Sequence, residues 1–266
     1  MPFFSIITPV YNGADFIVQY VRVLKSQSFS DWEAIIVDDG STDSSLELLN
    51  ACIDQDPRFR IYSREEISVK IVNGPYLARN IALDHASGDY LLFLDIDDVW
   101  QSSKLSSYQA YLSVRKVDLL VSGYTCSEYF PLKDNYFFRH PFFVFNSLYF
   151  TLLFCNPVPM LTACVRRNLV GSHRFLPINH EDFVFWHQLV SSRPDMVVQI
   201  LSDYSLSIYR LRPSSLSGNK IRSAIWMFRC YRHLGSSTFS SCLRITFWAL
   251  YQAGIQSFPR IRAFFG

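Results

Sequence analysis

The six cysteines of this 266-residue chain are scattered, and no two of them form a CxxC pair. This spacing argues against a zinc site and against a disulfide framework, so the thiols are expected to be reduced side chains of the core. The start of the chain, Met1–Phe4, also lacks the basic segment of a signal peptide. Internal repeats and low-complexity linkers are missing as well. These absences predict a cytoplasmic protein with one globular domain, or one domain with an appendage.

The chain also lacks an uninterrupted apolar run long enough to cross a membrane. The 25 residues between His140 and Arg166 are uncharged, but prolines and asparagines interrupt them. A transmembrane helix needs about 20 consecutive, mostly apolar residues. We therefore expect an apolar groove floor or a membrane-facing loop here, with a strand over Pro159–Val165.

Acidic residues are absent after Asp203, so the charge is divided unevenly. The chain has 23 acidic residues, all at or before Asp203, whereas residues 220–266 contain seven basic residues and no acid. The body, residues 1–219, is therefore acidic and the C-terminal tail is basic.

The basic tail interleaves its arginines with large apolar residues such as Trp226 and Phe247. Basic, aromatic helices of this kind lie in the membrane interface and are attracted to anionic lipid. We therefore predict a basic amphipathic helical extension over residues 220–266 that contacts an anionic membrane surface. A helix that covers the body, with its arginines facing water, is the alternative. Nucleic acid is a weaker alternative, because no recognised binding module accompanies the charge.

Strand and helix patterns alternate through the first hundred residues. Strands are predicted near residues 4–8, 32–37, 59–62 and 90–94, and helices over 14–28, 41–52 and 75–85. Either Ser41 or Thr42 is expected to cap the second helix. Such alternation predicts an α/β fold with a mostly parallel sheet and helices on both faces. A further strand over 118–123 and a helix over 181–191 are predicted beyond it.

Three carboxylates, those of Asp95, Asp97 and Asp98, follow the apolar run Tyr90–Leu94. Neighbouring carboxylates repel one another, and Mg²⁺ or Mn²⁺ relieves this repulsion because both ions take oxygen ligands. In open α/β sheets, ligands bind just outside the carboxyl ends of the strands. A solvated acidic turn is the alternative, but two further acidic clusters lie at comparable places in the chain.

The second acidic cluster, Asp38 and Asp39, also lies between a strand and a helix. A carboxylate there can accept a hydrogen bond from a ring N–H such as N3 of uracil; helix capping is the simpler alternative. The third cluster, Glu181 and Asp182, precedes several aromatic residues. Desolvation beside an aromatic wall would favour a general base, for which Asp182 is the candidate. Acids that merely complement the helix dipole are the alternative.

Two basic segments accompany the acidic clusters. Arg79 could pair with a diphosphate or with the acids of 95–98, or it could be an ordinary surface arginine of a helix. The stretch Ile208–Arg212, followed by Ser214, Ser215 and Ser217, could hold a leaving pyrophosphate or form a polar loop.

Taken together, the chain resembles a family 2 glycosyltransferase of the GT-A fold, of the bacterial polysaccharide-synthesis kind. The resemblance covers roughly residues 3–215. The segments that carry it are Ser5–Asn12, Trp32–Asp43, Ala78–Asn80, Gly88–Asp98 and Glu181–Asp182. Three places differ from the usual family pattern: Ile96 replaces a small polar residue, and Ile67–Val72 is unusually β-branched. The third is the later Tyr-Arg…Ser pattern of the family, which is only loosely met by Tyr209, Arg210, Ser215 and Ser217.

The resemblance implies a role for each matching residue. Thr8, Pro9 and Tyr11 line the nucleotide pocket, and Asp39 together with Asp38 reads the base. Arg79 lies near the diphosphate or donor sugar, and Asp95 faces ribose or sugar. Asp97 is the main protein ligand of Mn²⁺ or Mg²⁺, and Asp182 deprotonates the acceptor hydroxyl.

The implied reaction is an inverting transfer of a sugar from a nucleotide-sugar, expected to be UDP-linked, to a lipid-linked saccharide. The setting would be capsule, O-antigen or exopolysaccharide synthesis at the inner face of the cell membrane. A sugar-phosphate nucleotidyltransferase is one rival, but it would carry a basic, glycine-rich loop where this chain has Pro9–Gly13. A non-catalytic, membrane-associated interaction module is the other, and the intact acids argue against it.

Overall fold

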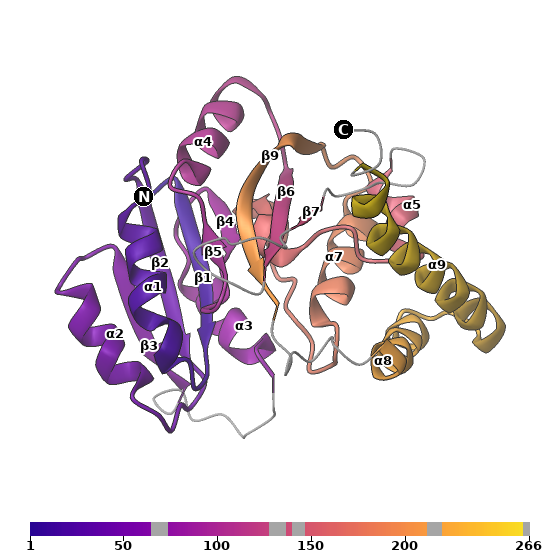
Figure 1. Cartoon of the computed structure of the whole chain (residues 1–266), viewed down its shortest axis with the longest axis horizontal. Helices are drawn as coiled ribbons and strands as arrows, with labels where there is room; N and C mark the ends of the chain where they lie inside the picture. The colour runs from indigo at the N-terminus through magenta and orange to yellow at the C-terminus, as the bar shows by residue number, and fades with distance from the viewer. Residues whose placement is uncertain (65–73, 128–136, 140–146, 212–219, 263–266) are drawn as a thin grey trace.

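The computed structural model describes residues 1–64, 74–127, 137–139, 147–211 and 220–262, and these residues form one curled nine-stranded sheet flanked by helices (Figure 1). The strands lie in the order β3-β2-β1-β4-β8-β6-β9-β5, and β7 pairs with β6. Their bounds are β1 Phe4–Val10, β2 Trp32–Asp38, β3 Phe59–Ser63, β4 Tyr90–Phe93, β5 Val99–Trp100, β6 Leu119–Ser127, β7 Phe137–Arg139, β8 Cys164–Arg166 and β9 Val198–Arg210.

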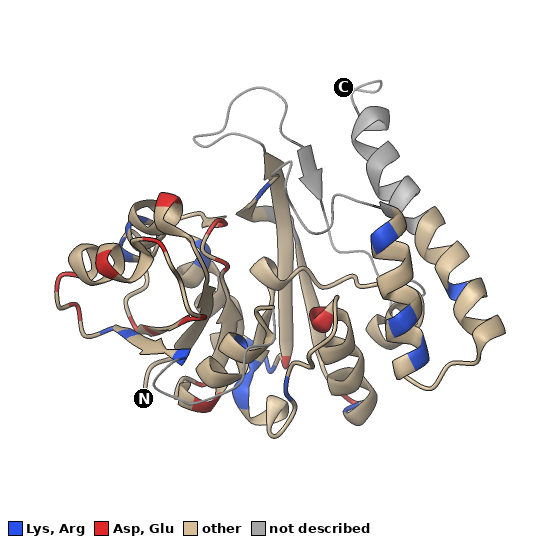
Figure 2. Cartoon of the chain, turned by 90° about the horizontal axis from the view of Figure 1, so that it is seen from below, with Lys and Arg blue, Asp and Glu red and all other residues tan. Residues whose placement is uncertain are grey.

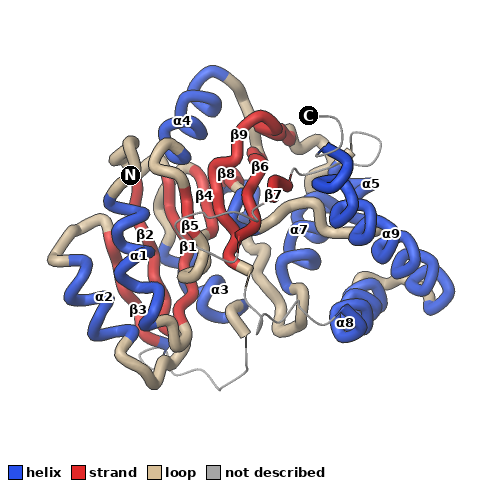
Figure 3. The backbone as a smooth tube through the Cα atoms, in the orientation of Figure 1, coloured by secondary structure: helices blue, strands red, loops and turns tan. Residues whose placement is uncertain are grey.

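Helices cover both faces of this sheet (Figure 3). One face packs against α1, α2 and α4, and the other against α3, α5, α7 and α8. The helices are α1 Ala14–Lys25, α2 Ser45–Ile53, α3 Tyr76–His85, α4 Lys104–Val114, α5 Leu148–Leu152, α6 Arg167–Val170, α7 Glu181–Ser192, α8 Lys220–His233 and α9 Thr238–Arg262, with a short 3-10 helix, η3, over Met160–Thr162.

The central strands are buried on both faces, as their unbroken apolar runs predict. On β1, Ile6 faces the α1 layer while Ile7 faces the α3 layer. On β4, Leu92 and Phe93 divide in the same way. All four side chains have at most 1% of their surface exposed, so the sheet is the middle layer of three.

The predicted parallel arrangement is confirmed. Strands β1 to β4 pair only in parallel with one another, and β6 and β9 run in the same direction. The three strands that run the opposite way, β5, β7 and β8, are only two or three residues long. The carboxyl ends of the six long strands therefore meet at one edge of the sheet, where ligands of α/β proteins bind.

The strand predicted over Pro159–Val165 is only partly correct. The segment begins with η3, and the strand β8 starts at Cys164. Proline has no N–H for a strand ladder and fixes its own φ angle. The Pro159 carbonyl instead accepts hydrogen bonds from the backbone and the hydroxyl of Thr162, which closes the turn.

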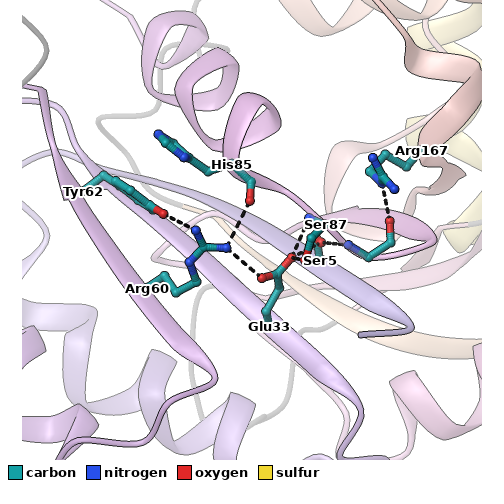
Figure 4. A network of polar contacts seen from close by, with 8 residues as sticks. Ser5, Glu33, Arg60, Tyr62, His85, Ser87 and Arg167 are labelled. Atoms are coloured by element: carbon teal, nitrogen blue, oxygen red, sulfur yellow. Dashed lines mark hydrogen bonds and ion pairs between the residues drawn. The ribbon is translucent and has the colours of Figure 1, made fainter. Parts of the chain in front are cut away.

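A polar network closes the opposite, amino edge of the sheet (Figure 4). Glu33 accepts hydrogen bonds from the hydroxyls of Ser5 and Ser87, and it pairs with Arg60. Burial alone would raise the pKa of Glu33, but these hydrogen bonds outweigh it, so the pKa is lowered. A side chain at Gly88 would lie 2.7 Å from the backbone nitrogen of Ser5, so only glycine fits there. The network joins the starts of β1 and β2 to the turn before β4, at the edge opposite the acidic clusters.

The helices α8 and α9 occupy the region predicted as a helical extension. Met227, Cys230 and Tyr231 of α8 are buried in the same core cluster as α3 and α7. The predicted alternative, a helix that covers the body, therefore describes the inner face of α8. Charged positions on the described part of the α8–α9 pair are basic throughout (Figure 2). Within the ranges the structure describes, no helix combines the length and apolarity needed to cross a membrane.

Candidate active site

Arg79, on α3, connects two of the three acidic clusters. Its guanidinium lies 2.7 Å from Asp95 at the end of β4 and 2.5 Å from Glu181 at the start of α7. Only 5% of the arginine side chain is exposed. The two acids are 86 residues apart in sequence and are joined here by one fork-shaped cation, a geometry that arginine provides and lysine does not.

The charges around Arg79 depend on one another. Burial opposes a charge on Arg79, but the carboxylates of Asp95 and Glu181 outweigh it and raise the pKa of the guanidinium. Burial also raises the pKa of Glu181; pairing with Arg79 opposes this shift and the charge of Asp182 adds to it. A buried arginine that carries two carboxylates is therefore the electrostatic centre of the site.

Asp182, the predicted base, lies in the first turn of α7. Its Oδ2 accepts a 2.7 Å hydrogen bond from the side-chain amide of Asn156, whose own oxygen accepts from the backbone N–H of Val158. This pair of bonds fixes which way the amide points. The aromatic residues that follow it, Phe183, Phe185 and Trp186, are all buried in the core beneath α7.

The acids after β4 form a tight turn. The N–H of Asp98 donates to the carbonyl of Asp95 at 3.1 Å. Arg210, at the end of β9, braces this turn: its backbone N–H donates to the Asp98 carboxylate and its Nε donates to the Asp97 carbonyl. Ile96, the departure from the family pattern, packs against Gly13, where an added Cβ would lie 3.1 Å from it. Its apolar side chain thus joins the turn to the loop after β1.

Asp97 is the residue predicted to hold a divalent cation. Among the residues that the structure describes, no group of three or more His, Cys, Asp or Glu side chains is arranged to bind a metal by itself. Mg²⁺ at phosphate sites uses one or two carboxylates, and substrate phosphates and waters supply the remaining ligands. A half-exposed carboxylate at the carboxyl edge of the sheet fits this kind of site and does not fit an all-protein cage.

The remaining acidic cluster lies at the end of β2, beside β1. The backbone N–H of Asp39 donates to the carbonyl of Val10, and its carboxylate pairs with Arg64 at 2.7 Å. Burial raises the pKa of Asp39, and Arg64 partly offsets the shift. Asp38 accepts hydrogen bonds from the backbone N–H groups of Gly40 and Ser41, so its carboxylate closes the turn.

Two loops at this edge are tied together. Asn12, after β1, accepts from the backbone of Thr42 and donates its N–H to Ser41. The predicted cap is therefore wrong: α2 begins at Ser45, because Ser41 and Thr42 bond to the neighbouring loop. Asp43 bonds to Ser45 and to the N–H of Ala14, which completes the junction.

The three residues predicted to line the nucleotide pocket, Thr8, Pro9 and Tyr11, differ in how far they are exposed to solvent. Tyr11 is 62% exposed and Pro9 is half-buried. Thr8 is different from the other two, because the whole residue is buried and its hydroxyl accepts a hydrogen bond from Tyr20, so it does not line an open pocket here. Thr8 lies on the same side of β1 as Ile6 and Val10, the side that packs against α1.

The structure thus brings Asp95, Glu181 and Asp182 together through Arg79, with the 38–39 turn at the same edge of the sheet. Arg64 and Asn156 were missed, because neither belongs to a motif. Arg64 follows β3 and meets Asp39 from the neighbouring strand, whereas Asn156 reaches Asp182 from a distant segment. Arg210 braces the 95–98 turn from a strand. The hydroxyls of Ser214, Ser215 and Ser217 and the stretch Ile67–Val72 lie outside the described residues.

A curled α/β sheet with acids and a bridging arginine at its carboxyl edge is the arrangement that the resemblance to GT-A glycosyltransferases predicts. A model of glycosyl transferase family 2 matches residues 5–158, and the chain belongs to this family. An uncharacterized glycosyltransferase from Haemophilus influenzae is 33% identical over 234 residues, which cover 87% of this chain and 88% of the relative. Escherichia coli WfaP, a UDP-Glc:alpha-D-GlcNAc-diphosphoundecaprenol beta-1,3-glucosyltransferase, is 28% identical over 250 residues, 94% of each chain.

Solved structures show the same fold. TarS from S. aureus, in complex with UDP-GlcNAc, aligns with a TM-score of 0.68 at 21% identity, over 98% of this chain and 74% of TarS. Glucosyl-3-phosphoglycerate synthase from Mycobacterium tuberculosis, in complex with Mn²⁺, UDP and phosphoglyceric acid, aligns with a TM-score of 0.60 at 21% identity, over 86% of this chain and 78% of the synthase. At this level of identity the likeness concerns the fold.

Proposed function

We propose that this glycosyltransferase moves a hexose from a UDP-sugar to a lipid-linked saccharide, with inversion at the anomeric carbon, in the synthesis of a bacterial surface polysaccharide. The observation that carries the proposal is the placement of Arg79 between Asp95 and Glu181. Arg79 thereby joins the acidic cluster predicted to face the donor to the acidic cluster that contains the predicted acceptor base. A transferase needs both partners at one place, since correct orientation of two reactants lowers the barrier substantially.

Each residue has a defined part in this proposal. Asp39 accepts a hydrogen bond from the ring N–H of uracil through the oxygen that Arg64 does not hold. Asp97 would hold a divalent cation, with the donor diphosphate supplying further ligands. When bound, Mn²⁺ or Mg²⁺ acts as a Lewis acid that neutralises charge on the departing UDP.

Asp182 takes the proton from the acceptor hydroxyl as that hydroxyl attacks the anomeric carbon. The hydrogen bond from Asn156 leaves the other carboxylate oxygen, Oδ1, for the acceptor. Attack opposite the leaving UDP inverts the configuration in a single displacement.

The relatives support this choice of substrates. WfaP is described as transferring glucose from UDP-glucose to a diphosphoundecaprenol-linked sugar. UDP-GlcNAc is bound in the TarS structure, and UDP with Mn²⁺ in the synthase structure. These facts make UDP-glucose and a GlcNAc-diphospholipid the first substrates to test.

The first prediction concerns the metal. With UDP-glucose, a short-chain GlcNAc-diphospholipid and Mn²⁺, we expect UDP release coupled to glycolipid formation. Chelation with EDTA should lower the rate about 100-fold or more, because metal charge stabilisation contributes several kcal/mol. Added Mn²⁺ should restore activity in the native chain but not in Asp97→Ala. Full activity in EDTA would contradict the metal role, and no release of UDP from any nucleotide-sugar would contradict the function.

We also propose that the α8–α9 pair rests on the inner face of the membrane, where a lipid-linked acceptor would lie. The outer surface of the pair exposes large apolar side chains between its arginines: Ile221, Ile225, Phe239, Leu243 and Leu250. Each basic residue near an anionic surface adds about 1 kcal/mol of attraction. This combination supports peripheral binding.

The second prediction tests that surface without disturbing the buried face of α8. The native chain should float with liposomes that contain phosphatidylglycerol, and Phe239→Glu with Leu243→Glu should lower the bound fraction several-fold, because two charges replace two inserted apolar side chains. Val114→Glu, at an equally exposed apolar position on α4, should bind as the native chain does. Equal flotation of all three proteins would remove the membrane proposal.

A further inference from the structure

The C-terminal helices contact both chain segments that place the acceptor base. Asp182 is held on one side by Asn156, in the segment after α5, and on the other by the turn Asn179–His180 that leads into α7. Neither segment has regular secondary structure. Each must therefore be held in place by its neighbours, and α8 is a neighbour of both.

The first contact is made by Tyr231. Its side chain is fully buried, and its hydroxyl donates a hydrogen bond to the backbone carbonyl of Phe154, two residues before Asn156. Burial raises the pKa of this phenol, so it remains a protonated donor. The ring of Phe154 in turn packs against Phe247 of α9, with ring centroids 4.6 Å apart. Both C-terminal helices therefore contact Phe154, in the segment that carries Asn156.

The second contact is made one residue earlier in α8. The thiol of Cys230 lies 3.2 Å from the carbonyl of Asn179, and Trp226 packs against the ring of His180 at 5.8 Å. His180 has a φ of +56°, a left-handed conformation that is uncommon for a non-glycine residue and requires support from its surroundings. Tyr231 also packs edge-on against Phe183, in the first turn of α7.

These contacts support a role for the tail in the reaction itself. We propose that α8, chiefly through Tyr231, is a positioning element for Asp182, so that the acceptor base is correctly placed only when the C-terminal helices are seated. This inference rests on the proposed function, in which Asp182 is the base. It assigns the buried face of α8 to chemistry and leaves the exposed face of the α8–α9 pair for the membrane.

The decisive variant is Tyr231→Phe in the full chain, because it removes one hydroxyl and keeps the ring packing. We expect kcat for transfer from UDP-glucose to the GlcNAc-diphospholipid to fall about 10-fold, since small errors in the placement of a catalytic group are costly. The KM for UDP-glucose should stay unchanged, because Tyr231 contacts Phe154 and Phe183, which belong to the acceptor side of the site. Tyr149→Phe makes the same change at an exposed tyrosine of α5 and should leave both constants unchanged.

A second measurement does not depend on turnover. Amide hydrogen exchange of Tyr231→Phe should be faster at residues 154–158 and 179–183 and unchanged in β1 and β4. Unchanged exchange in the two segments would overturn the inference, even if the native chain transferred no sugar. A native kcat, or equal losses in kcat and in UDP-glucose binding, would also overturn it, because equal losses indicate general destabilisation.

Discussion

Asp182→Asn is expected to lower the rate of sugar transfer roughly 10²- to 10⁴-fold, the usual contribution of a general base. Asparagine keeps the size of the side chain but cannot take the proton of the acceptor hydroxyl. The affinity for UDP-glucose should remain that of the native chain, because the residues assigned to the donor are unchanged. Steady-state kinetics with the GlcNAc-diphospholipid measure the first quantity, and calorimetric titration with UDP-glucose measures the second.

The matched control is Asp195→Asn, which makes the same change at an exposed aspartate just beyond α7. It should transfer sugar at the native rate. If Asp182→Asn also turns over normally, another group must accept the proton, and Asp182 would be confined to its contact with Asn156. A joint loss of transfer and donor binding would instead indicate a disturbed site, because a base contributes to the chemical step alone.

Arg79→Met is expected to have the largest effect on stability. Removing one partner of a buried ion pair leaves the other charge unpaired, which typically costs about 3–5 kcal/mol. Glu181 would lose its pairing with Arg79 while it remains largely buried beside Asp182. Urea unfolding at neutral pH should therefore show a large fall in the free energy of unfolding.

Two controls separate this effect from a general loss of charge. The double variant Arg79→Met with Glu181→Gln should recover part of the stability, because it removes the buried charge as well. Arg174→Met breaks an exposed pair with Asp84 and should cost less than about 1 kcal/mol. Equal, small effects of Arg79→Met and Arg174→Met would show that Arg79 does not hold the site together.

Local sequence patterns predicted most of the strands and helices of the sheet region, but not every element boundary. Apolar runs such as Tyr90–Leu94 predict buried strands because a strand between two helical layers must be apolar on both faces. The prediction of a strand from Pro159 was wrong for its first half, because the Pro159 carbonyl accepts hydrogen bonds from the N–H and the hydroxyl of Thr162 and closes a tight turn. Hydropathy does not register this local competition.

The sequence by itself determined the alternating fold and the place of the acids at strand ends, because both depend on short-range periodicity. Only the tertiary structure decided which charges meet. Arg79 pairs with Glu181 across 102 residues, and Asn156 reaches Asp182 from an uncharged stretch that carries no motif. It also decided that α8 belongs to the core. Such pairings depend on how helices pack across a sheet, and residue spacing along the chain does not contain that geometry.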